Sequence, residues 1–174
     1  TARLFRHTRN IRLTFHPDQF VLLSSPRKNV TQLSVADLEY HGELAELLGA
    51  DVITIHGGGA YGDAASSLTR LEKNIDLLSP RVRQRLALEN DDRVYSPEQL
   101  LATCKRLSVP LVYDVHHHRC LKDSLGIEEA TTEARATWDR EPLFHLSSPK
   151  DGWAARDPKK HHDYIDASDV PDAW

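Results

Sequence analysis

The hydrophobic residues of this chain fall into two alternating patterns. Short apolar runs with the length and composition of buried strands occupy residues 11–15, 52–55, 85–88, 111–113 and 143–144. Between these runs, apolar residues recur at helical spacing over residues 34–49, 67–78, 97–107 and 127–137. Ser34 and Ser96 stand where helix N-caps are expected, and Gly49 stands at a helix end. The pattern therefore predicts strands and helices in alternation.

Strands that alternate with helices, without hairpin turns between them, pair in parallel through right-handed crossovers. Each predicted strand is followed directly by a side chain that can bind a metal: His16, His56, Glu89, Asp114 and His145. Parallel strands bring their carboxyl ends to one edge, where barrel enzymes build their active sites. The sequence therefore predicts an α/β protein with the architecture of a TIM (β/α)8 barrel.

The length of the chain modifies this prediction. A closed barrel of this kind has eight strands and about 250 residues, whereas this chain has 174 residues and five predicted strands. No helix is predicted before the first strand, and a helix start at residues 170–174 is cut short. We therefore expect a single α/β domain over residues 1–174 that forms the central part of a barrel, truncated at both ends. A smaller open α/β sheet, complete as it stands, is the alternative.

The residues at the strand ends are typical of a metal site, because imidazole and carboxylate groups that meet at one point bind divalent transition metals. Glu89 is the best candidate for a carboxylate that bridges two ions. Asp114 and His117 lie three positions apart after a strand, so a turn can direct both at one ion. The ten histidines are a high count for this length. The sequence predicts a polynuclear metal site, with His116 and His118 facing solvent or supporting the ligands.

The composition limits the kinds of partner and the cellular compartment that we expect for this protein. A net charge of −4 argues against a generally basic nucleic-acid binder but allows a local basic face. The two cysteines, Cys104 and Cys120, form no disulfide framework, which fits a reducing compartment. No apolar run reaches the roughly 20 residues of a membrane span, and no signal peptide is visible. We expect a cytoplasmic protein without a membrane partner.

Five short motifs follow the predicted strands. They begin at His16 (HPDQF), His56 (HGGGAYG), Leu88 (LEND), Asp114 (DVHH) and His145 (HLSSP). In order and spacing, this series resembles the successive motifs of the UV damage endonucleases. The resemblance runs from near the first residue to near the last. Each motif alone is short, and the HGG triplet occurs in other metal-dependent barrels, but the full series is specific.

This resemblance implies an ATP-independent DNA repair endonuclease with a TIM-barrel fold, which nicks DNA on the 5′ side of ultraviolet photoproducts. Its cofactor would be a cluster of divalent ions, Mn²⁺ in the first place, with Zn²⁺ or Mg²⁺ as alternatives. Its partner would be damaged double-stranded DNA, bound by a monomer.

The resemblance also implies a set of site residues. The metal ligands would be His16, His56, Glu89, Asp114, His117, His145 and His161. Among them, Glu89, Asp114 and His117 would form the catalytic group. His162 would take the place of His161 if the register were shifted by one residue. Asn90, next to Glu89, would orient a ligand from behind.

Two departures from the family pattern stand out. Some relatives carry a modified lysine two positions before the histidine that follows the fifth strand, and Leu143 occupies that position here. A carboxylated lysine ligand therefore cannot form there. The family's first histidine ligand and its final glutamate ligand belong to strands outside this sequence.

Gln19 and Phe20 follow His16 by one turn, at the rim where a substrate must arrive. A flat ring and an amide can enter a distorted duplex, where stacking on an exposed base contributes roughly 1–3 kcal/mol. The family has Gln followed by an aromatic residue, usually Tyr, at this place. The alternative is a buried Phe20 that begins the apolar run 20–23.

Lys159 and Lys160 lie in a long polar loop over residues 149–162. They are candidates for phosphate contacts, and a solvated charge pair is an equal alternative.

Two other functions fit parts of the pattern. Another metal-dependent barrel enzyme, either an abasic-site endonuclease or a sugar isomerase or epimerase, would use similar ligands, although a sugar enzyme would not need Gln19 and Phe20 on its rim. A non-catalytic fragment that binds metal or nucleic acid is the third hypothesis.

Overall fold

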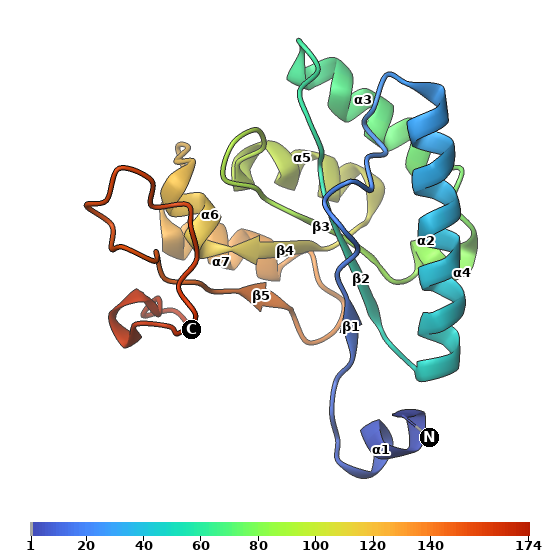
Figure 1. The fold of residues 1–174 in the computed structure, drawn as a ribbon, viewed down its shortest axis with the longest axis horizontal. Coiled ribbons are helices and arrows are strands. Elements are labelled where there is room, and N and C mark those ends of the chain that lie inside the picture. The colour runs from blue at the N-terminus through green and yellow to red at the C-terminus, as the bar shows by residue number, and fades with distance from the viewer. Residues whose placement is uncertain (1) are drawn as a thin grey trace. The chain divides into compact units, whose positions relative to one another are not determined.

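The computed structural model describes residues 2–174. The chain divides into two compact units, the first ending at Leu88 and the second starting at Glu89. Both units are built from parallel strands with helices between them (Figure 1). The strands follow one another in chain order in each unit. The predicted α/β class with crossover helices is therefore confirmed.

The first unit contains four helices, α1 (Ala2–Thr8), α2 (Lys28–Leu48), α3 (Ala64–Ile75) and α4 (Pro80–Arg83), among its described residues. Its strands are β1 (Thr14–Phe15), β2 (Val52–His56) and the start of β3 (Leu86–Glu89). Strands β1 and β2 pair in parallel, with Thr14 opposite Val52. The Ile53 N–H donates to the Arg85 carbonyl at 2.7 Å, which joins β2 to the chain entering β3.

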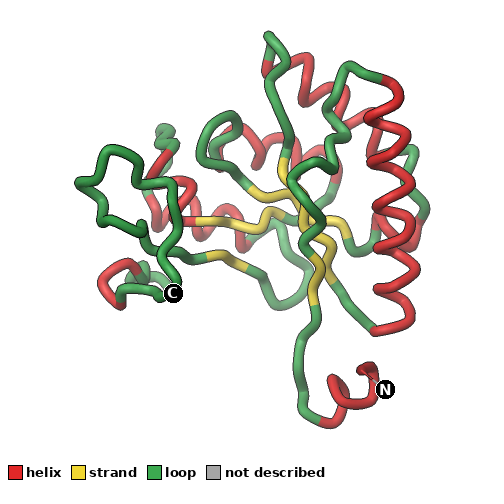
Figure 2. The backbone as a smooth tube through the Cα atoms, in the orientation of Figure 1, coloured by secondary structure: helices red, strands yellow, loops and turns green. Residues whose placement is uncertain are grey.

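The second unit contains α5 (Pro97–Leu107), β4 (Leu111–Asp114), α6 (Val115–Cys120), α7 (Ile127–Arg135), β5 (Phe144–His145) and the 3-10 turn η1 (Ala167–Asp169). Strands β4 and β5 are parallel, and Asp114 stands opposite His145. After β5 the backbone is almost entirely loop, as the tube in Figure 2 shows. This unit therefore presents the ends of two neighbouring strands together with a long loop.

Local signals in the sequence explain several of the helix ends. Gly49 ends α2 with φ of 78°, a left-handed conformation that favours glycine. Ser96 is the N-cap of α5, as the sequence predicted, and it forms a capping box with Gln99. The Asp63 carboxylate caps α3 by accepting from the backbone N–H groups of Ala65 and Ser66.

The interior strands are buried along their whole length. All four residues of β3 and of β4 are buried, and β2 is buried up to its last residue, His56. Strands covered on both faces read as continuous apolar runs, which is why the sequence located them within one or two residues. Each of these apolar strands ends at a polar side chain: His56, Glu89 or Asp114.

The beginning of the chain differs from the prediction. Helix α1 precedes the first strand, where no helix was expected, and the strand itself is limited to Thr14–Phe15. Helix α2 begins at Lys28, so Ser34 is not its N-cap. The Ser34 hydroxyl lies inside the helix, donates to the Val30 carbonyl at 2.9 Å and accepts from the Leu22 N–H at 2.8 Å. Ser34 therefore resembles a cap in sequence but ties the preceding loop to the helix.

Two predictions near the end of the chain were also wrong. The His-rich stretch expected as a loop is the short helix α6, because the Asp114 side chain caps it. Residues 170–174 do not form a helix, and the turn η1 comes just before them. Val170 has φ of −70° and ψ of 123°, an extended conformation that the following Pro171 favours.

Within residues 2–174, no helix combines the length and the apolar character that crossing a bilayer requires. The expectation of a single domain over residues 1–174 stays a prediction.

Helix α2 packs closely against α4 at Gly42, which generates a prediction about stability. A Cβ atom added at Gly42 would lie 2.7 Å from Cγ2 of the fully buried Val82. We expect Gly42→Ala to lower the free energy of unfolding by about 1–2 kcal/mol, because overpacking outweighs the gain in helix propensity. Adding Val82→Ala removes the clashing methyl group, so the double variant should lose less than the sum of the two single variants.

Urea unfolding of the four proteins measures this coupling. Gly126→Ser is the control, because a Cβ at Gly126 meets nothing within 4 Å, and we expect its stability to change by less than about 0.5 kcal/mol. Additive losses in the double variant would contradict the close approach of α2 and α4.

Candidate metal centre

Three strands in succession end on the residues expected to bind metal. Glu89 is the last residue of β3, Asp114 the last of β4 and His145 the last of β5. All three lie in the second unit, where Asp114 and His145 stand opposite one another across the strand pair. The carboxyl ends of these strands therefore bring two carboxylates and an imidazole together.

Glu89 occupies the centre of this group and is only 2% exposed. Its Oε1 lies 2.9 Å from Nδ1 of His145 and 3.7 Å from Nδ1 of His117. Glu89, Asp114 and His117 each offer one ligand atom within 4.8 Å of the other two. This spacing is compatible with a shared cation.

The start of α6 explains how Asp114 and His117 come to face the same point. Asp114 is the N-cap of the helix, and its Oδ1 accepts from the His117 backbone N–H at 2.8 Å. Its Oδ2 lies 3.5 Å from the His117 ring nitrogen Nδ1. The predicted turn that directs both side chains at one place is present, and it is the first turn of a helix.

Asn90 fixes both of these residues from behind. Its side-chain amide donates to the Asp114 carbonyl and accepts from the Asp114 N–H, each at 2.9 Å. The backbone carbonyl of Asn90 lies 2.9 Å from Nδ1 of His117. Because a carbonyl only accepts, His117 carries its proton on Nδ1 and keeps the lone pair of Nε2 for a ligand. Asn90 thus lies where an orienting residue was expected.

The electrostatics of the group favour a cation. Burial raises the pKa of Asp114, the nearby His117 opposes this shift, and the Glu89 carboxylate adds to it. Two buried carboxylates close together are unfavourable unless positive charge compensates them. The site therefore has negative charge to offer to a metal ion.

The histidines beside His117 are buried, so the solvent-facing alternative for them was wrong. His118 lies between the Tyr113 hydroxyl, at 2.7 Å from Nδ1, and the Asp123 carboxylate, at 3.0 Å from Nε2. Burial raises the pKa of Tyr113 well above its ordinary value, so the phenol stays protonated and donates to His118. This chain of hydrogen bonds holds α6 in place.

His116 has a different environment. Its Nδ1 lies 3.0 Å from the Ser147 carbonyl, while its buried Nε2 has no hydrogen-bond partner among residues 2–174. The His161 ring lies edge-on to it, with the ring centroids 4.7 Å apart. A buried nitrogen without a partner next to another imidazole is the kind of group that a bound ligand would satisfy.

The long loop brings His161 to the same place. Its ring centroid lies 5.7 Å from that of His117, and Pro149 and His161 form an isolated antiparallel bridge. Partial burial lowers the pKa of His161, and His116 and His117 lower it further. The neighbouring His162 instead accepts from the Tyr164 N–H at 2.9 Å. The geometry favours His161 over His162 as the residue that belongs to the group.

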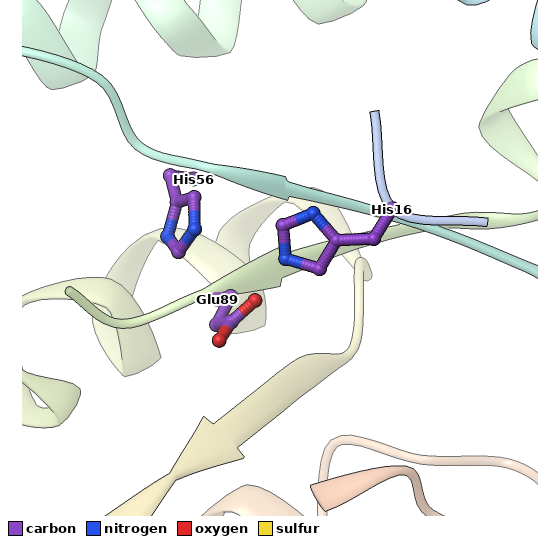
Figure 3. A group of neighbouring side chains, drawn as sticks. All are labelled: His16, His56 and Glu89. Atoms are coloured by element: carbon purple, nitrogen blue, oxygen red, sulfur yellow. The ribbon is translucent and has the colours of Figure 1, made fainter. Parts of the chain in front are cut away.

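Two predicted ligands lie in the first unit. His16 directly follows β1 and His56 ends β2, and their imidazoles lie side by side with centroids 5.2 Å apart (Figure 3). Strands β1 and β2 are parallel neighbours, so their carboxyl ends lie at the same edge, where the two imidazoles meet.

Gln19 and Phe20 lie in the loop after His16, and both are exposed. Phe20 is 73% exposed, so the alternative of a buried Phe20 is wrong. Its ring borders an open groove of about 550 Å³ that Val30 and Leu33 of α2 also line. An aromatic ring of this size in water is an available contact surface.

The two lysines of the long loop differ. Lys159 donates to the Asp92 backbone carbonyl and lies 3.6 Å from the Asp92 carboxylate. Lys160 is exposed. Of the two, Lys160 has the side chain that is better placed for a phosphate.

Sequence reasoning missed a group of residues around this loop. Trp153 packs against His116, with ring centroids 5.1 Å apart, and its indole N–H donates to Asp169 at 2.7 Å. A lone Trp in a polar loop was a signal for an anchored segment, whereas nothing local marked Asp169.

Comparisons with known proteins agree with the motifs. A UV DNA damage endonuclease of Bacillus velezensis is 39% identical over 166 residues, which are 91% of this chain and 51% of that protein. The UV DNA damage endonuclease of Bacillus pumilus is 38% identical over 167 residues, 92% of this chain and 51% of that protein. The chain thus spans about half the length of the curated relatives that it matches.

Solved structures support the fold. A crystal structure of SacUVDE matches 94% of this chain and 56% of its own, with a TM-score of 0.88 and 30% identity. Endonuclease IV from Thermus thermophilus matches 94% of this chain and 63% of its own, with a TM-score of 0.71 at 23% identity. A xylose isomerase-like TIM barrel fusion protein matches 85% of this chain and 24% of its own, with a TM-score of 0.61 at 17% identity. The last two likenesses concern the fold alone, and they confirm part of a TIM barrel rather than a separate kind of open sheet.

The family model described as UV-endonuclease UvdE matches residues 2–173, nearly the whole chain. The resemblance carried by the five strand-end motifs is confirmed by this match and by relatives at 38–39% identity. This chain therefore belongs to the UV-endonuclease UvdE family.

Proposed function

We propose that this chain supplies the metal centre and a lesion-contacting loop of a DNA repair endonuclease, which nicks duplex DNA on the 5′ side of ultraviolet photoproducts. One observation carries the proposal. In a member of the UvdE family, the buried carboxylates of Glu89 and Asp114 meet the imidazoles of His117 and His145 at the ends of consecutive strands.

The donor set fits a divalent transition metal. Glu89, Asp114, His117, His145 and His161 would supply oxygen and nitrogen ligands from the second unit. Mixed nitrogen and oxygen donors suit Mn²⁺ or Zn²⁺ better than Mg²⁺, which prefers oxygen alone. Of the two, Mn²⁺ is the ion we propose. The unsatisfied Nε2 of buried His116 supports a ligand beside His161.

We further propose that His16 and His56 complete the cluster. Glu89 follows Leu88 directly in β3, and the Ile53–Arg85 hydrogen bond aligns β2 with the chain entering that strand. His16 and His56 would add two imidazole ligands to the residues named above. Glu89 would then be the carboxylate shared by the ions of the cluster.

The chemistry assigned to these residues is hydrolysis of a phosphodiester. Bound divalent ions lower the pKa of a water molecule and neutralise charge on the attacking and leaving oxygens. The protein's own contribution is to hold the carboxylates in register. Asn90 fixes Asp114 and His117, and the His145 ring is hydrogen-bonded to Glu89.

Gln19 and Phe20 are proposed to recognise the lesion. Photoproducts weaken base stacking, so an exposed ring and an amide can enter the duplex at the damaged step. Phe20 projects into solvent beside an apolar groove, which supports this role. Lys160 is the proposed phosphate contact of the long loop, and Lys159 would have to leave Asp92 to make one.

The family match favours this function over an abasic-site endonuclease or a sugar epimerase, for which only the fold is shared. A monomer that acts on damaged duplex DNA in the cytoplasm completes the proposal.

Removing the charge of Glu89 tests the metal centre. We expect Glu89→Gln to lower nicking of irradiated duplex at least about a hundredfold in a protein with the full length of the relatives, because a neutral amide cannot bridge two cations. Binding of Mn²⁺ to this chain, measured by calorimetry, should weaken in parallel. The fold, measured by circular dichroism, should not change.

Glu133→Gln is the matched control for that variant. Glu133 lies on α7, and its exposed carboxylate forms an ion pair with Lys105 of α5. Surface ion pairs contribute about 0–1 kcal/mol to stability, so this substitution should change little. Cleavage by Glu89→Gln at the wild-type rate with Mn²⁺ present would show that Glu89 is not a catalytic ligand.

Replacing Gln19 and Phe20 tests lesion recognition separately from catalysis. We expect Gln19→Ala with Phe20→Ala to weaken binding to irradiated duplex by about 1–3 kcal/mol, the contribution of one stacked aromatic ring. Binding to undamaged duplex depends mainly on phosphate contacts and should barely change. The measurement is the ratio of the two affinities at one salt concentration, together with metal content.

Tyr40→Ala, which removes another exposed aromatic ring of the first unit, serves as the control and should leave the ratio unchanged. An unchanged ratio in the Gln19 and Phe20 double variant would remove this pair from lesion recognition.

A further inference from the structure

We propose that Asp169 is a positioning residue that holds the loop of residues 149–162 so that His161 is presented to the metal centre. This inference rests on the proposed function, because it takes His161 as a metal ligand. It assigns a role to a buried carboxylate outside the motifs at the strand ends.

Asp169 ends the turn η1 and is only 7% exposed. Its carboxylate accepts from the Ser148 hydroxyl at 2.5 Å and from the Trp153 indole N–H at 2.7 Å. Arg119 of α6 donates to the Asp169 backbone carbonyl at 2.8 Å. We call Ser148, Trp153, Asp169 and Arg119 the Asp169 cluster. It joins α6, the start of the loop, the loop itself and the turn η1 in one network of hydrogen bonds.

The base of the loop is closed by its own backbone. Lys150 donates to the Lys160 carbonyl at 2.7 Å, and His162 donates to the Ser148 carbonyl at 2.8 Å. Beyond this base, Asp151, Gly152 and Ala154 are exposed. Among them stands Trp153, whose side chain reaches back to the body of the unit. The indole, although 38% exposed, is therefore the contact through which Asp169 reaches the middle of the loop.

The Trp153 ring transmits this restraint to the metal centre. It packs against the His116 ring at 5.1 Å, and Arg119 lies 5.5 Å from its centroid. His116 is in turn packed edge-on against His161 at 4.7 Å. A shift of the indole would remove one wall of the space that the two imidazoles occupy. Asp169 thus acts on His161 through Trp153 and His116, without touching a reacting atom.

The variant Asp169→Asn keeps the shape of the side chain but cannot accept from both donors. Residues that orient metal ligands from behind typically change metal affinity about 10- to 100-fold when they are replaced. We expect this variant to weaken Mn²⁺ binding to the chain by a factor in that range, measured by titration calorimetry. Trp153→Phe, which keeps an aromatic ring but removes the indole N–H donor, should weaken binding in the same direction.

A double-mutant cycle separates positioning from a general loss of structure. In a His161→Ala background, Asp169→Asn should weaken Mn²⁺ binding no further, because its effect passes through His161. Asp166→Asn is the matched control, since Asp166 is an exposed carboxylate of the same turn that bonds only within it. Equal losses of affinity with and without the His161 ring would overturn the proposal.

Limited trypsin digestion gives a second readout that does not depend on metal. Release of the indole should speed cleavage at Arg156, Lys159 and Lys160 in Asp169→Asn, while the thermal midpoint of the remaining structure stays near that of the wild type. Unchanged cleavage would overturn the restraint on the loop. If the wild-type chain takes up no Mn²⁺, the proposed function fails, and faster cleavage in the variant would still support the restraint alone.

Discussion

The burial of two carboxylates at neighbouring strand ends is the constraint on which the second unit depends. Glu89 and Asp114 are each only 2% exposed. A buried acidic side chain is unfavourable unless donors or cations surround it, so each nearby element contributes one. Helix α6 gives the His117 N–H to Asp114, and β5 gives the His145 ring to Glu89. The arrangement brings the imidazoles of His117 and His145 within 3.7 Å of the Glu89 carboxylate.

Asn90 shows how closely fold and site are connected. A side-chain amide that donates and accepts on the backbone of Asp114 replaces a strand hydrogen bond at the end of β4. The same residue sets the tautomer of His117 through its backbone carbonyl. These hydrogen bonds within the protein are enough to hold Asp114 and His117 in their relative positions.

The loop after β5 is fixed by different means. It has no regular secondary structure, so side chains such as Trp153 and Asp169 hold it. Segments of this kind are common where a protein contacts its ligands, because they can be shaped without changing the strands beneath them. In this UvdE-family chain, the loop brings His161 beside His117.

Much of this molecule was determined by its sequence alone. Buried strands read as continuous apolar runs, so their positions were predictable, as were the polar residues at their ends, such as Glu89 and Asp114. The capping box at Ser96 and the glycine at position 49 also carry local signals. Because the strand-end motifs are local as well, the family was recognisable before any coordinates.

Other features were decided only by the tertiary structure. Ser34 has the local signature of a cap, yet a hydrogen bond to Leu22, 12 residues away, places it inside α2. The exposure of Phe20 depends on what α2 leaves uncovered, which no pattern of neighbouring residues reveals. Asp169 meets Trp153 across 16 residues and Ser148 across 21 residues of irregular chain. Interactions between residues so far apart depend on how the loop folds back on the unit. The periodicity of hydrophobic residues reports only local structure, so it cannot predict these interactions.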